Sequence, residues 1–392
     1  MAARTSSEPT SATLPDEGRT NGPGRRVAIV GAGMIAAVHR RSARMAGAEV
    51  IGVLASSSAR SAKAARAWQV REAFADIDAV AASDADVVHV CSPNATHAPF
   101  VETLLSAGKH VICEKPLGVS LEQAERMADL AARSGLVATV PFVYRYHPVV
   151  REIRGRAAAG DFGAWNLLHG HYLQDWLLSA RASNWRVDAG LGGPSRAFAD
   201  IGSHWCDLVE WVTGERFAHL TAQTAIAVPQ RPAEFSATFT LGPDGAERVG
   251  VSTEDIATVM LRTTTGVPAS VVISQVAAGR KNRLWFELDG SDASAVFDQE
   301  HAEAFWLGEE SGSRRIVRGP DHGTVEQRRL SYLPAGHAQG YADCFDAFVA
   351  DTYASIDGQE PDGLPTFADG LRAARIVDAM LRSAGTSEWR EI

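Results

Sequence analysis

Three side chains, in two separate stretches of the sequence, have the types and spacing needed to oxidise a secondary alcohol. Lys115 follows the apolar run 109–113 and precedes Pro116, which restricts its backbone to extended geometry. Asp200 and His204 stand one helical turn apart, so the acid could orient the imidazole. When a carbinol loses a hydride, a histidine can take the hydroxyl proton and an ammonium can stabilise the charge on oxygen. Lys115, Asp200 and His204 are therefore candidates for catalytic groups.

Each of these groups also has an ordinary structural explanation. A lysine just past a strand is commonly a surface charge, and an aspartate before a histidine can be a helix cap followed by a core ring. The catalytic interpretation therefore depends on the elements that carry the two stretches.

A glycine-rich turn near the amino end predicts a dinucleotide site. The apolar run 27–30 is followed by the pattern G-x-G-x-x-A from Gly31 to Ala36, and then by a helical stretch. In this setting the glycines permit a tight turn and close approach to a pyrophosphate, while the helix amino terminus offers free N–H groups. We expect the phosphate contacts at Gly31, Gly33, Met34 and Ile35.

The end of the next predicted strand, 49–54, bears on which nicotinamide cofactor binds. Folds that select NAD usually place an acid here for the ribose hydroxyls, but residues 51–70 contain no Asp or Glu. Ser56 and Arg60 could instead hold a 2′-phosphate, which favours NADP over NAD. A serine cap on the following helix, with a solvated arginine, explains the same residues.

Alternating strands and helices predict that the first domain, residues 25–147, is a Rossmann fold with a doubly wound parallel sheet. Its later strands are expected at 86–91, 109–113 and 136–142, with helices between them. Residues 1–24 are rich in Ser, Thr, Pro and Gly and are predicted to be a disordered extension.

The rest of the chain, residues 148–392, is predicted to form an α+β domain. Apolar and polar residues alternate at 259–263, 267–276 and 284–288, separated by short turns, which is typical of a mostly antiparallel sheet. The helix at 200–213 should cover one face of this sheet. The other face stays open and needs a different cover.

Four stretches of the sequence, taken together, resemble one enzyme family. They read GAGMIA from residue 31, CSPNATHAP from 91, GKHVICEKPL from 108 and ADIGSHWCDLVEWVTG from 199. From residue 26 to 385 the chain resembles the family of glucose-fructose oxidoreductase, inositol dehydrogenase and rhizopine catabolism protein (Gfo/Idh/MocA). The resemblance implies an NAD(P)-dependent enzyme that moves a hydride between the cofactor and a secondary alcohol or ketone of a sugar or polyol.

The resemblance also implies roles for residues and for surfaces. Lys115, Asp200 and His204 match the positions at which related enzymes carry their Lys, Asp and His. The pair Trp185-Arg186 is similar to a family pair that lies near the cofactor. Similar proteins use the open sheet face to form dimers or tetramers, so we expect a homodimer or homotetramer.

Further contacts are expected at the strand ends and in the loops. Aromatic and polar loop residues suit a polyol because they offer a stacking face and hydroxyl partners, but they also serve as plain loop anchors. The histidine before the helix at 341–354 could equally lie in a surface loop. The expected cofactor contacts are Ser92, Asn94, His97, Glu114, Lys115, Trp185 and Arg186, and the expected substrate contacts are Tyr144, Asp175, Trp176 and His337.

Composition narrows the partners and the compartment. The 38 Lys and Arg against 47 Asp and Glu give a net charge of −9, which argues against nucleic acid and anionic membranes as partners. The four cysteines are widely spaced, so neither a disulfide framework nor a metal site emerges. No apolar run is long enough to span a bilayer. We expect a cytoplasmic protein with a small-molecule substrate and no metal.

Two other functions stay open at the level of sequence. The site could oxidise a glycoside transiently, eliminate a group and reduce the product with a retained nicotinamide. The chain would then be a glycosidase or lyase without a net change in nicotinamide absorbance. It could also be a non-catalytic sensor of NADP, although a sensor has no need of the Lys, Asp and His set.

Overall fold

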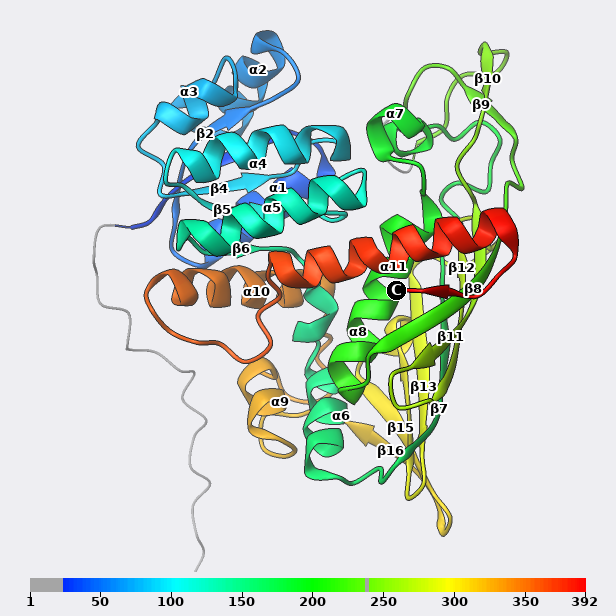
Figure 1. Ribbon diagram of the computed structural model, residues 1–392. Helices are drawn as coiled ribbons and strands as arrows, with labels where there is room; N and C mark the ends of the chain where they lie inside the picture. The colour runs from blue at the N-terminus through cyan, green and yellow to red at the C-terminus, as the bar shows by residue number, and fades with distance from the viewer. Residues whose placement is uncertain (1–23, 237–239) are drawn as a thin grey trace, which may run out of the picture.

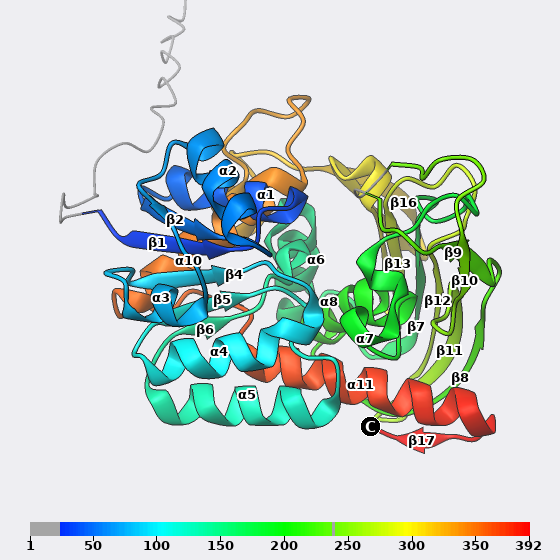
Figure 2. The same ribbon diagram turned by 90° about the horizontal axis from the view of Figure 1, so that it is seen from above.

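The computed structural model of the chain describes residues 24–236 and 240–392. The extension predicted at 1–24 therefore lies outside the described residues, except for Gly24. Two sheets dominate the structure, one in each predicted domain (Figure 1, Figure 2). The fold class predicted from the sequence is confirmed.

The amino-terminal domain is built on six parallel strands in the order β3-β2-β1-β4-β5-β6. The central strands are almost completely buried, which explains their uninterrupted apolar runs. The strands are β1 (Arg26–Val30), β2 (Glu49–Leu54), β3 (Glu72–Ala73), β4 (Val87–Val90), β5 (His110–Cys113) and β6 (Ala138–Thr139). The helices between them are α1 (Met34–Met45), α2 (Ser58–Trp68), α3 (Ile77–Ala82), α4 (His97–Ser106) and α5 (Leu121–Ser134).

The strand expected at 136–142 is shorter than predicted. β6 contains only two residues, because the N–H of Val140 donates to the carbonyl oxygen of Pro365 outside the sheet (3.1 Å). The next residue, Pro141, has no N–H to donate to a neighbouring strand. The backbone then enters a 3₁₀ turn at Val143–Tyr146 and leaves the sheet.

Helix α10 (Tyr341–Ile356) returns from the second half of the chain to the first domain. Its Phe345 and Phe348 are fully buried in one cluster with Val27 and Ile29 of β1. Figure 1 shows α10 beneath the Rossmann sheet, beside the start of α11. The core of the first domain thus includes a helix from the segment predicted as the second domain.

The carboxyl-terminal domain is built on nine strands in the order β16-β15-β14-β13-β7-β12-β11-β8-β17. Neighbouring strands are antiparallel, except that β12 pairs in parallel with β7, so the predicted mostly antiparallel sheet is confirmed. The strands are β7 (Trp165–Leu173), β8 (Phe217–Ala225), β11 (Ile256–Thr263), β12 (Pro268–Ser274), β13 (Arg283–Gly290), β14 (Ser294–Asp298), β15 (Ala304–Glu309), β16 (Gly312–Val317) and β17 (Arg390–Glu391).

Helices cover one face of this sheet. Trp205 of α8 is fully buried against Gly170 of β7 and donates its indole N–H to the carbonyl oxygen of Trp285 (3.1 Å). A Cβ at position 170 would lie 2.4 Å from that indole nitrogen, so only glycine permits this contact. The remaining elements are helices α6 (Pro148–Ala159), α7 (Ala189–Gly192), α8 (Ser203–Thr213), α9 (Val325–Leu330) and α11 (Phe367–Thr386), and strands β9 (Gln230–Pro232) and β10 (Arg248–Gly250). Within residues 24–236 and 240–392, no helix has the length and apolar character needed to cross a bilayer.

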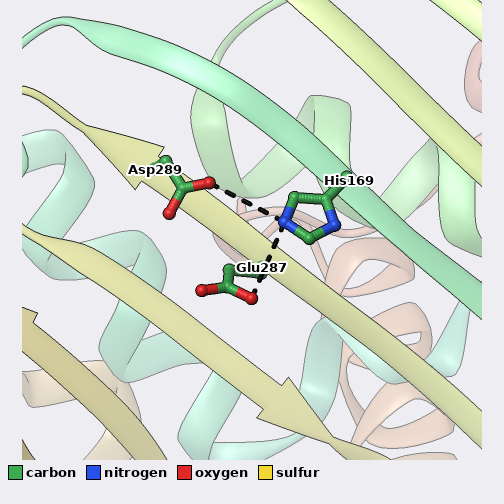
Figure 3. Close-up of side chains that lie close together, drawn as sticks. All are labelled: His169, Glu287 and Asp289. Carbon is green, nitrogen blue, oxygen red and sulfur yellow. Dashed lines mark ion pairs between the residues drawn. The ribbon is translucent and has the colours of Figure 1, made fainter.

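The opposite face of the nine-stranded sheet carries exposed apolar and charged side chains. Strand residues alternate between the two faces, so His169 of β7 points away from the buried Leu168. His169 lies beside Glu287 and Asp289 of β13, with its Nε2 3.6 Å and 3.7 Å from their carboxylate oxygens (Figure 3). A protonated imidazole would pair with both acids. The large apolar side chains exposed on this sheet are Leu167, Met260, Val272, Trp306 and Val317.

Candidate active site

The predicted Lys115 and Asp200 meet across the two domains. Lys115 follows β5 at the carboxyl end of the Rossmann strands, where open α/β sheets bind ligands. Its Nζ lies 2.6 Å from Oδ1 of Asp200 and 3.0 Å from the Asp200 carbonyl oxygen. Both side chains are about six-sevenths buried, at 13% and 15% exposure. This ion pair fixes the lysine at the junction of the two domains.

The carboxylate of Asp200 binds Lys115 rather than the ring of His204. Besides Lys115, Gln275 donates its Nε2–H to Oδ2 (2.8 Å), and the Nε of Arg186 lies 3.6 Å from Oδ1. Within the described part of the chain no hydrogen bond joins Asp200 to His204. The turn between them is a π-helix, Phe198–Gly202. The expectation that Asp200 orients the imidazole is therefore corrected: charged donors hold a carboxylate more strongly than a neutral ring does.

His204 presents a neutral imidazole to the site. Burial, and then the charge of Lys115, lower the pKa of His204 to about 3, although Asp200 acts in the opposite direction. The rings of Phe142 and Tyr144 are nearly perpendicular to the imidazole, with centroids 5.6 Å and 5.2 Å away. At neutral pH the ring is unprotonated and can accept a proton.

Asp200 is ionised in spite of its burial. Burial alone would raise the pKa of this carboxyl, but the charges of Lys115 and Arg186 and the hydrogen bond from Lys115 hold the pKa well below its usual range. Arg186 in turn lies over the ring of Trp185, with its guanidinium carbon 4.4 Å from the ring centroid. The predicted Trp-Arg pair thus lies at the site, with Arg186 facing Asp200.

The glycine-rich turn makes a close backbone contact at Gly31 and leaves open space at Gly33. Gly31 has a φ of +118°, and a Cβ there would lie 2.7 Å from the carbonyl oxygen of Cys91. At Gly33 a Cβ would meet nothing within 4 Å, so the space in front of this backbone is open. Gly33 precedes α1 and supplies no side-chain cap, which leaves the first N–H groups of the helix for a phosphate. Met34 is exposed and Ile35 is partly buried at the start of this helix.

The serine-rich turn after β2 contains both a serine that caps the next helix and a serine that contacts Arg60. Ser57 caps α2 by accepting the N–H of Arg60 (3.3 Å). The Arg60 guanidinium donates to the hydroxyl of Ser56 (2.9 Å). Arg60 forms no ion pair with any acid of the described residues, so its charge is available to a phosphate.

The residues predicted after β4 hold loops together. Asn94 is buried and donates its Nδ2–H to the carbonyl oxygen of Gly192 (2.8 Å), which ties the two domains. Ser92 pairs its hydroxyl with that of Thr96 (2.6 Å). The fully buried His97 places its two ring nitrogens 2.9 Å from the carbonyl oxygens of Pro116 and Ser92. No atom of the His97 ring faces open space, so its predicted cofactor contact is replaced by support of the Lys115 loop.

A network of neutral polar groups adjoins His204. The hydroxyls of Tyr144 and Tyr172 lie 2.7 Å apart, and Asn282 bonds to both of them (3.1 Å and 2.7 Å). Gln174 donates to the same Asn282 amide oxygen (2.8 Å) and accepts from the indole of Trp176 (3.0 Å). Burial raises the pKa of Tyr144 to about 12, so its hydroxyl keeps its proton.

Two residues predicted to contact substrate have other surroundings. Asp175 forms an ion pair with Lys281 (2.6 Å) and accepts the N–H of Gly279 (3.1 Å). His337 is exposed in the loop before α10, where its carbonyl oxygen binds Arg318. These contacts place His337 in a surface loop. The expectation that it contacts substrate is therefore corrected.

Gln275 and Asn282 are site residues that the sequence did not indicate. They stand just after β12 and just before β13, and each contacts a residue of the candidate site more than 70 positions away. A lone Gln or Asn near a strand end carries no motif, so only their position at the carboxyl edge of β12 and the start of β13 could have pointed to them.

A cavity that is open to solvent, with about 710 Å³ of empty space including that solvent, lies beside Lys115 on the side of α11. Lys115 belongs both to the lining of this cavity and to the polar site described above, whereas Asp200, His204 and Tyr144 are absent from the cavity lining. Its wall includes apolar groups of α11 and of the loops that follow Lys115 and Gly192, and its lining includes Leu117, Val119, Phe142, Ala373, Val377 and Leu381.

Comparison with known proteins matches both halves of the chain. The model of an oxidoreductase family with an NAD-binding Rossmann fold (GFO_IDH_MocA) matches residues 25–142. The model of the GFO/IDH/MocA carboxyl-terminal domain matches residues 150–296. These two ranges coincide with the Rossmann sheet and with most of the nine-stranded sheet.

Relatives of known name cover most of the chain. Levoglucosan dehydrogenase of Pseudarthrobacter phenanthrenivorans is 31% identical over 319 residues, which covers 79% of this chain and 80% of the relative. Inositol 2-dehydrogenase of Rhizobium meliloti is 26% identical over 372 residues and covers 94% and 98%. Glucose-6-phosphate 3-dehydrogenase of Bacillus subtilis is 23% identical over 365 residues and covers 93% and 97%.

Solved structures agree with the fold. An oxidoreductase domain protein from Kribbella flavida has a TM-score of 0.84 at 30% identity, covering 94% of this chain and 99% of its own. Levoglucosan dehydrogenase in complex with NADH and L-sorbose has a TM-score of 0.85 at 27% identity, with the same two coverages. With both domain models matched over more than half of its length, this chain belongs to the Gfo/Idh/MocA family of NAD-binding oxidoreductases.

Proposed function

We propose that this chain transfers a hydride between a nicotinamide cofactor and a secondary alcohol or ketone of a sugar or polyol. The observation that carries the proposal is the ion pair of Lys115 with Asp200, which joins the two domains beside a neutral His204. The relatives named for levoglucosan and inositol support the substrate class. The reaction class accounts for each of these three groups.

The bound nicotinamide supplies the hydride chemistry, and Gly31, Gly33 and the amino terminus of α1 would hold its dinucleotide. In the oxidation direction the neutral ring of His204 accepts the hydroxyl proton of the substrate while the C–H hydride leaves. Lys115 donates a hydrogen bond to the same oxygen and stabilises its developing negative charge. Asp200 keeps the Lys115 ammonium in position. In reduction, His204 returns the proton to the carbonyl oxygen.

The side chains around His204 favour a neutral polyol. Tyr144, Tyr172, Gln174 and Asn282 offer hydroxyl and amide groups, and Trp176 offers an apolar face. Each of these groups can exchange its internal hydrogen bond for one to a sugar hydroxyl. None of them carries the charge that a phosphate on the sugar would need. We therefore place an unphosphorylated sugar or cyclitol in this site.

We further propose NADP as the preferred cofactor. Arg60 and Ser56 stand together after β2 with no acid paired to the guanidinium among the described residues. This arrangement suits a 2′-phosphate better than a free ribose hydroxyl. A relative from Haloarcula marismortui that is 38% identical over 126 residues, D-xylose 1-dehydrogenase [NADP(+)], supports the possibility in this family.

The open face of the nine-stranded sheet is proposed as the contact between subunits. Its exposed Met260 and Val272 lie on neighbouring strands and would be buried by a second copy of the sheet. The outcome is a homodimer or homotetramer.

A substrate screen tests the proposal directly. Neutral sugars, anhydrosugars and inositols are offered with NAD and with NADP, while nicotinamide absorbance and product masses are followed together. Stoichiometric formation of reduced cofactor and ketone supports the dehydrogenase. A change in product mass without any change in absorbance would instead indicate transient oxidation by a retained cofactor.

A further inference from the structure

A chain of four buried polar side chains runs from the active site into the core of the first domain. Glu114 precedes Lys115, His39 lies on α1, His89 on β4 and Tyr353 on α10. The carboxylate Oε1 of Glu114 is 3.1 Å from Nε2 of His39. The two imidazoles meet through their Nδ1 atoms at 3.0 Å, and Nε2 of His89 is 2.9 Å from the Tyr353 hydroxyl.

The donors and acceptors of this chain fit one direction. An ionised carboxylate only accepts, so Nε2 of His39 donates to Glu114 and its Nδ1 is left as an acceptor. His89 then donates through Nδ1 and accepts the Tyr353 hydroxyl proton at Nε2. Every link of the hydrogen-bond chain then has a donor and an acceptor, and burial lowers the pKa of His89 well below its ordinary value. Protonation of Glu114 would reverse the chain and leave the Tyr353 proton without an acceptor among the described residues.

Glu114 acts on Lys115 through the backbone. Its second oxygen, Oε2, accepts the N–H of Lys115 (3.2 Å), so the carboxylate fixes the segment from which the ammonium extends. We propose that His39, His89 and Tyr353 are positioning residues, whose hydrogen-bond chain holds the buried Glu114 carboxylate ionised and fixed against the backbone of Lys115. The inference rests on the proposed function only for its effect on turnover.

The other groups that face Glu114 leave its ionisation dependent on the hydrogen-bond chain that begins at His39. Apart from His39, the titratable neighbours are Cys91 after β4, Cys113 of β5, His97 of α4, His204 of α8 and Tyr341 of α10, together with Lys115 itself. Burial favours the neutral form of each of these five groups, the two cysteine thiols, the imidazoles of His97 and His204, and the Tyr341 phenol. Lys115 is therefore the cation among these neighbours. Burial would raise the pKa of Glu114, but the hydrogen bond from His39, and then the charge of Lys115, hold it below its usual value.

The test measures the protonation of Glu114 without using activity. Infrared difference spectra of the full-length protein between neutral and mildly acidic pH are compared for wild type, His39→Leu, His39→Gln and the double variant His39→Leu/Glu114→Gln. The Leu side chain removes the donor to Oε1, whereas the Gln amide restores one. We expect a protonated carboxyl band in His39→Leu that is absent from the other three. A folded His39→Leu protein without this band would overturn the proposal.

The pH profile gives the second readout. Loss of a hydrogen bond to a charged group moves its pKa by about one to two units, so the acid limb of kcat/KM in His39→Leu should move to higher pH by about that much. Tyr353→Phe keeps the ring packing and should shift the limb in the same direction by less. If His39→Leu does not fold, Tyr353→Phe provides the test. An unchanged acid limb of kcat/KM and no new carboxyl band in Tyr353→Phe would reject the proposed role of the hydrogen-bond chain. The infrared band in a protein that turns over no sugar would reject the proposed function and keep this inference.

Discussion

Lys115 and Asp200 are 85 positions apart in the sequence, yet the lysine Nζ lies within 2.6 Å of the aspartate Oδ1 and 3.0 Å of its carbonyl oxygen. Lys115 lies just after the Rossmann strand β5, and Asp200 lies in the π-helix Phe198–Gly202 that precedes α8. The pair therefore depends on how the two domains are joined. Asn94, which donates to the carbonyl oxygen of Gly192, supports the same junction.

Removal of Lys115 should abolish most turnover while the cofactor still binds. Lys115→Ala takes away the group that stabilises the charge on the reacting oxygen, and we expect kcat to fall at least about a hundredfold. The Kd of the nicotinamide cofactor, measured by fluorescence titration, should change little. Lys63→Ala, which removes an exposed lysine of α2, is the matched control and should retain wild-type turnover. Near-normal kcat in Lys115→Ala would show that another group stabilises the oxygen.

Removal of His204 should slow the same step for a different reason. His204→Ala leaves no base for the hydroxyl proton, so kcat for oxidation should fall at least about a hundredfold, with cofactor affinity retained. Steady-state kinetics with a deuterated carbinol checks that the hydride step has become rate-limiting. If His204→Ala keeps wild-type kcat, the proton goes elsewhere.

Arg60 should decide between the two nicotinamide cofactors. Arg60→Ala removes a charged donor to the 2′-phosphate, which corresponds to about 1.5 to 3 kcal/mol, so the Kd of NADP should rise roughly 10- to 100-fold. The Kd of NAD should stay the same. Arg66→Ala, on the exposed side of the same helix, is the control. An equal loss of NAD and NADP affinity would contradict a 2′-phosphate site.

Asn282 should affect the sugar and not the cofactor. Asn282→Ala leaves the hydroxyls of Tyr144 and Tyr172 without their common amide, and we expect the KM of the sugar to rise about tenfold. Asn166→Ala, at an exposed position of β7, should leave KM unchanged. A change confined to the cofactor Kd would place Asn282 outside the sugar site.

Stability should fall on mild acidification because buried histidines resist protonation. Burial, and then the charge of Arg318, lower the pKa of His147 to about 3, and neither of its ring nitrogens has a hydrogen-bond partner among the described residues. Between this value and about 6.5 the unfolded chain binds the proton and the folded chain does not, so the free energy of unfolding falls as the pH drops through that window.

This group contributes up to about 1.4 kcal/mol per pH unit. Urea denaturation of wild type and His147→Leu from pH 7 downwards measures the two slopes. The slope should be shallower in His147→Leu and unchanged in His301→Leu, which replaces an exposed ring. Equal slopes in all three proteins would show that His147 does not titrate in this window.

Charge on the open sheet face should separate the subunits. Val272→Asp places a carboxylate on this face at a side chain that is 43% exposed in the isolated chain. We expect a lower mass by light scattering than for wild type. Val325→Asp, at a more exposed valine of α9, should keep the wild-type mass. If Val272→Asp keeps the wild-type mass, the subunits meet elsewhere or the chain is a monomer.

The sequence by itself determined the order of strands and helices, the glycine turn and the place of Lys115 at a strand end. These features follow from periodicity and from backbone preferences, which act between residues a few positions apart. The buried parallel strands of the first domain and the alternating strands of the second were readable for this reason. The short β6 was not, because Val140 bonds to Pro365, far away in the sequence.

Tertiary structure alone decided which partners the reactive groups have. The spacing of Asp200 and His204 placed both near the site, but the carboxylate binds Lys115 and Gln275 instead of the ring. Likewise, α10 enters the first domain and carries Tyr353 to the end of a chain that begins at Glu114. A charge selects its partner by distance and by burial, and both are fixed only when the domains pack.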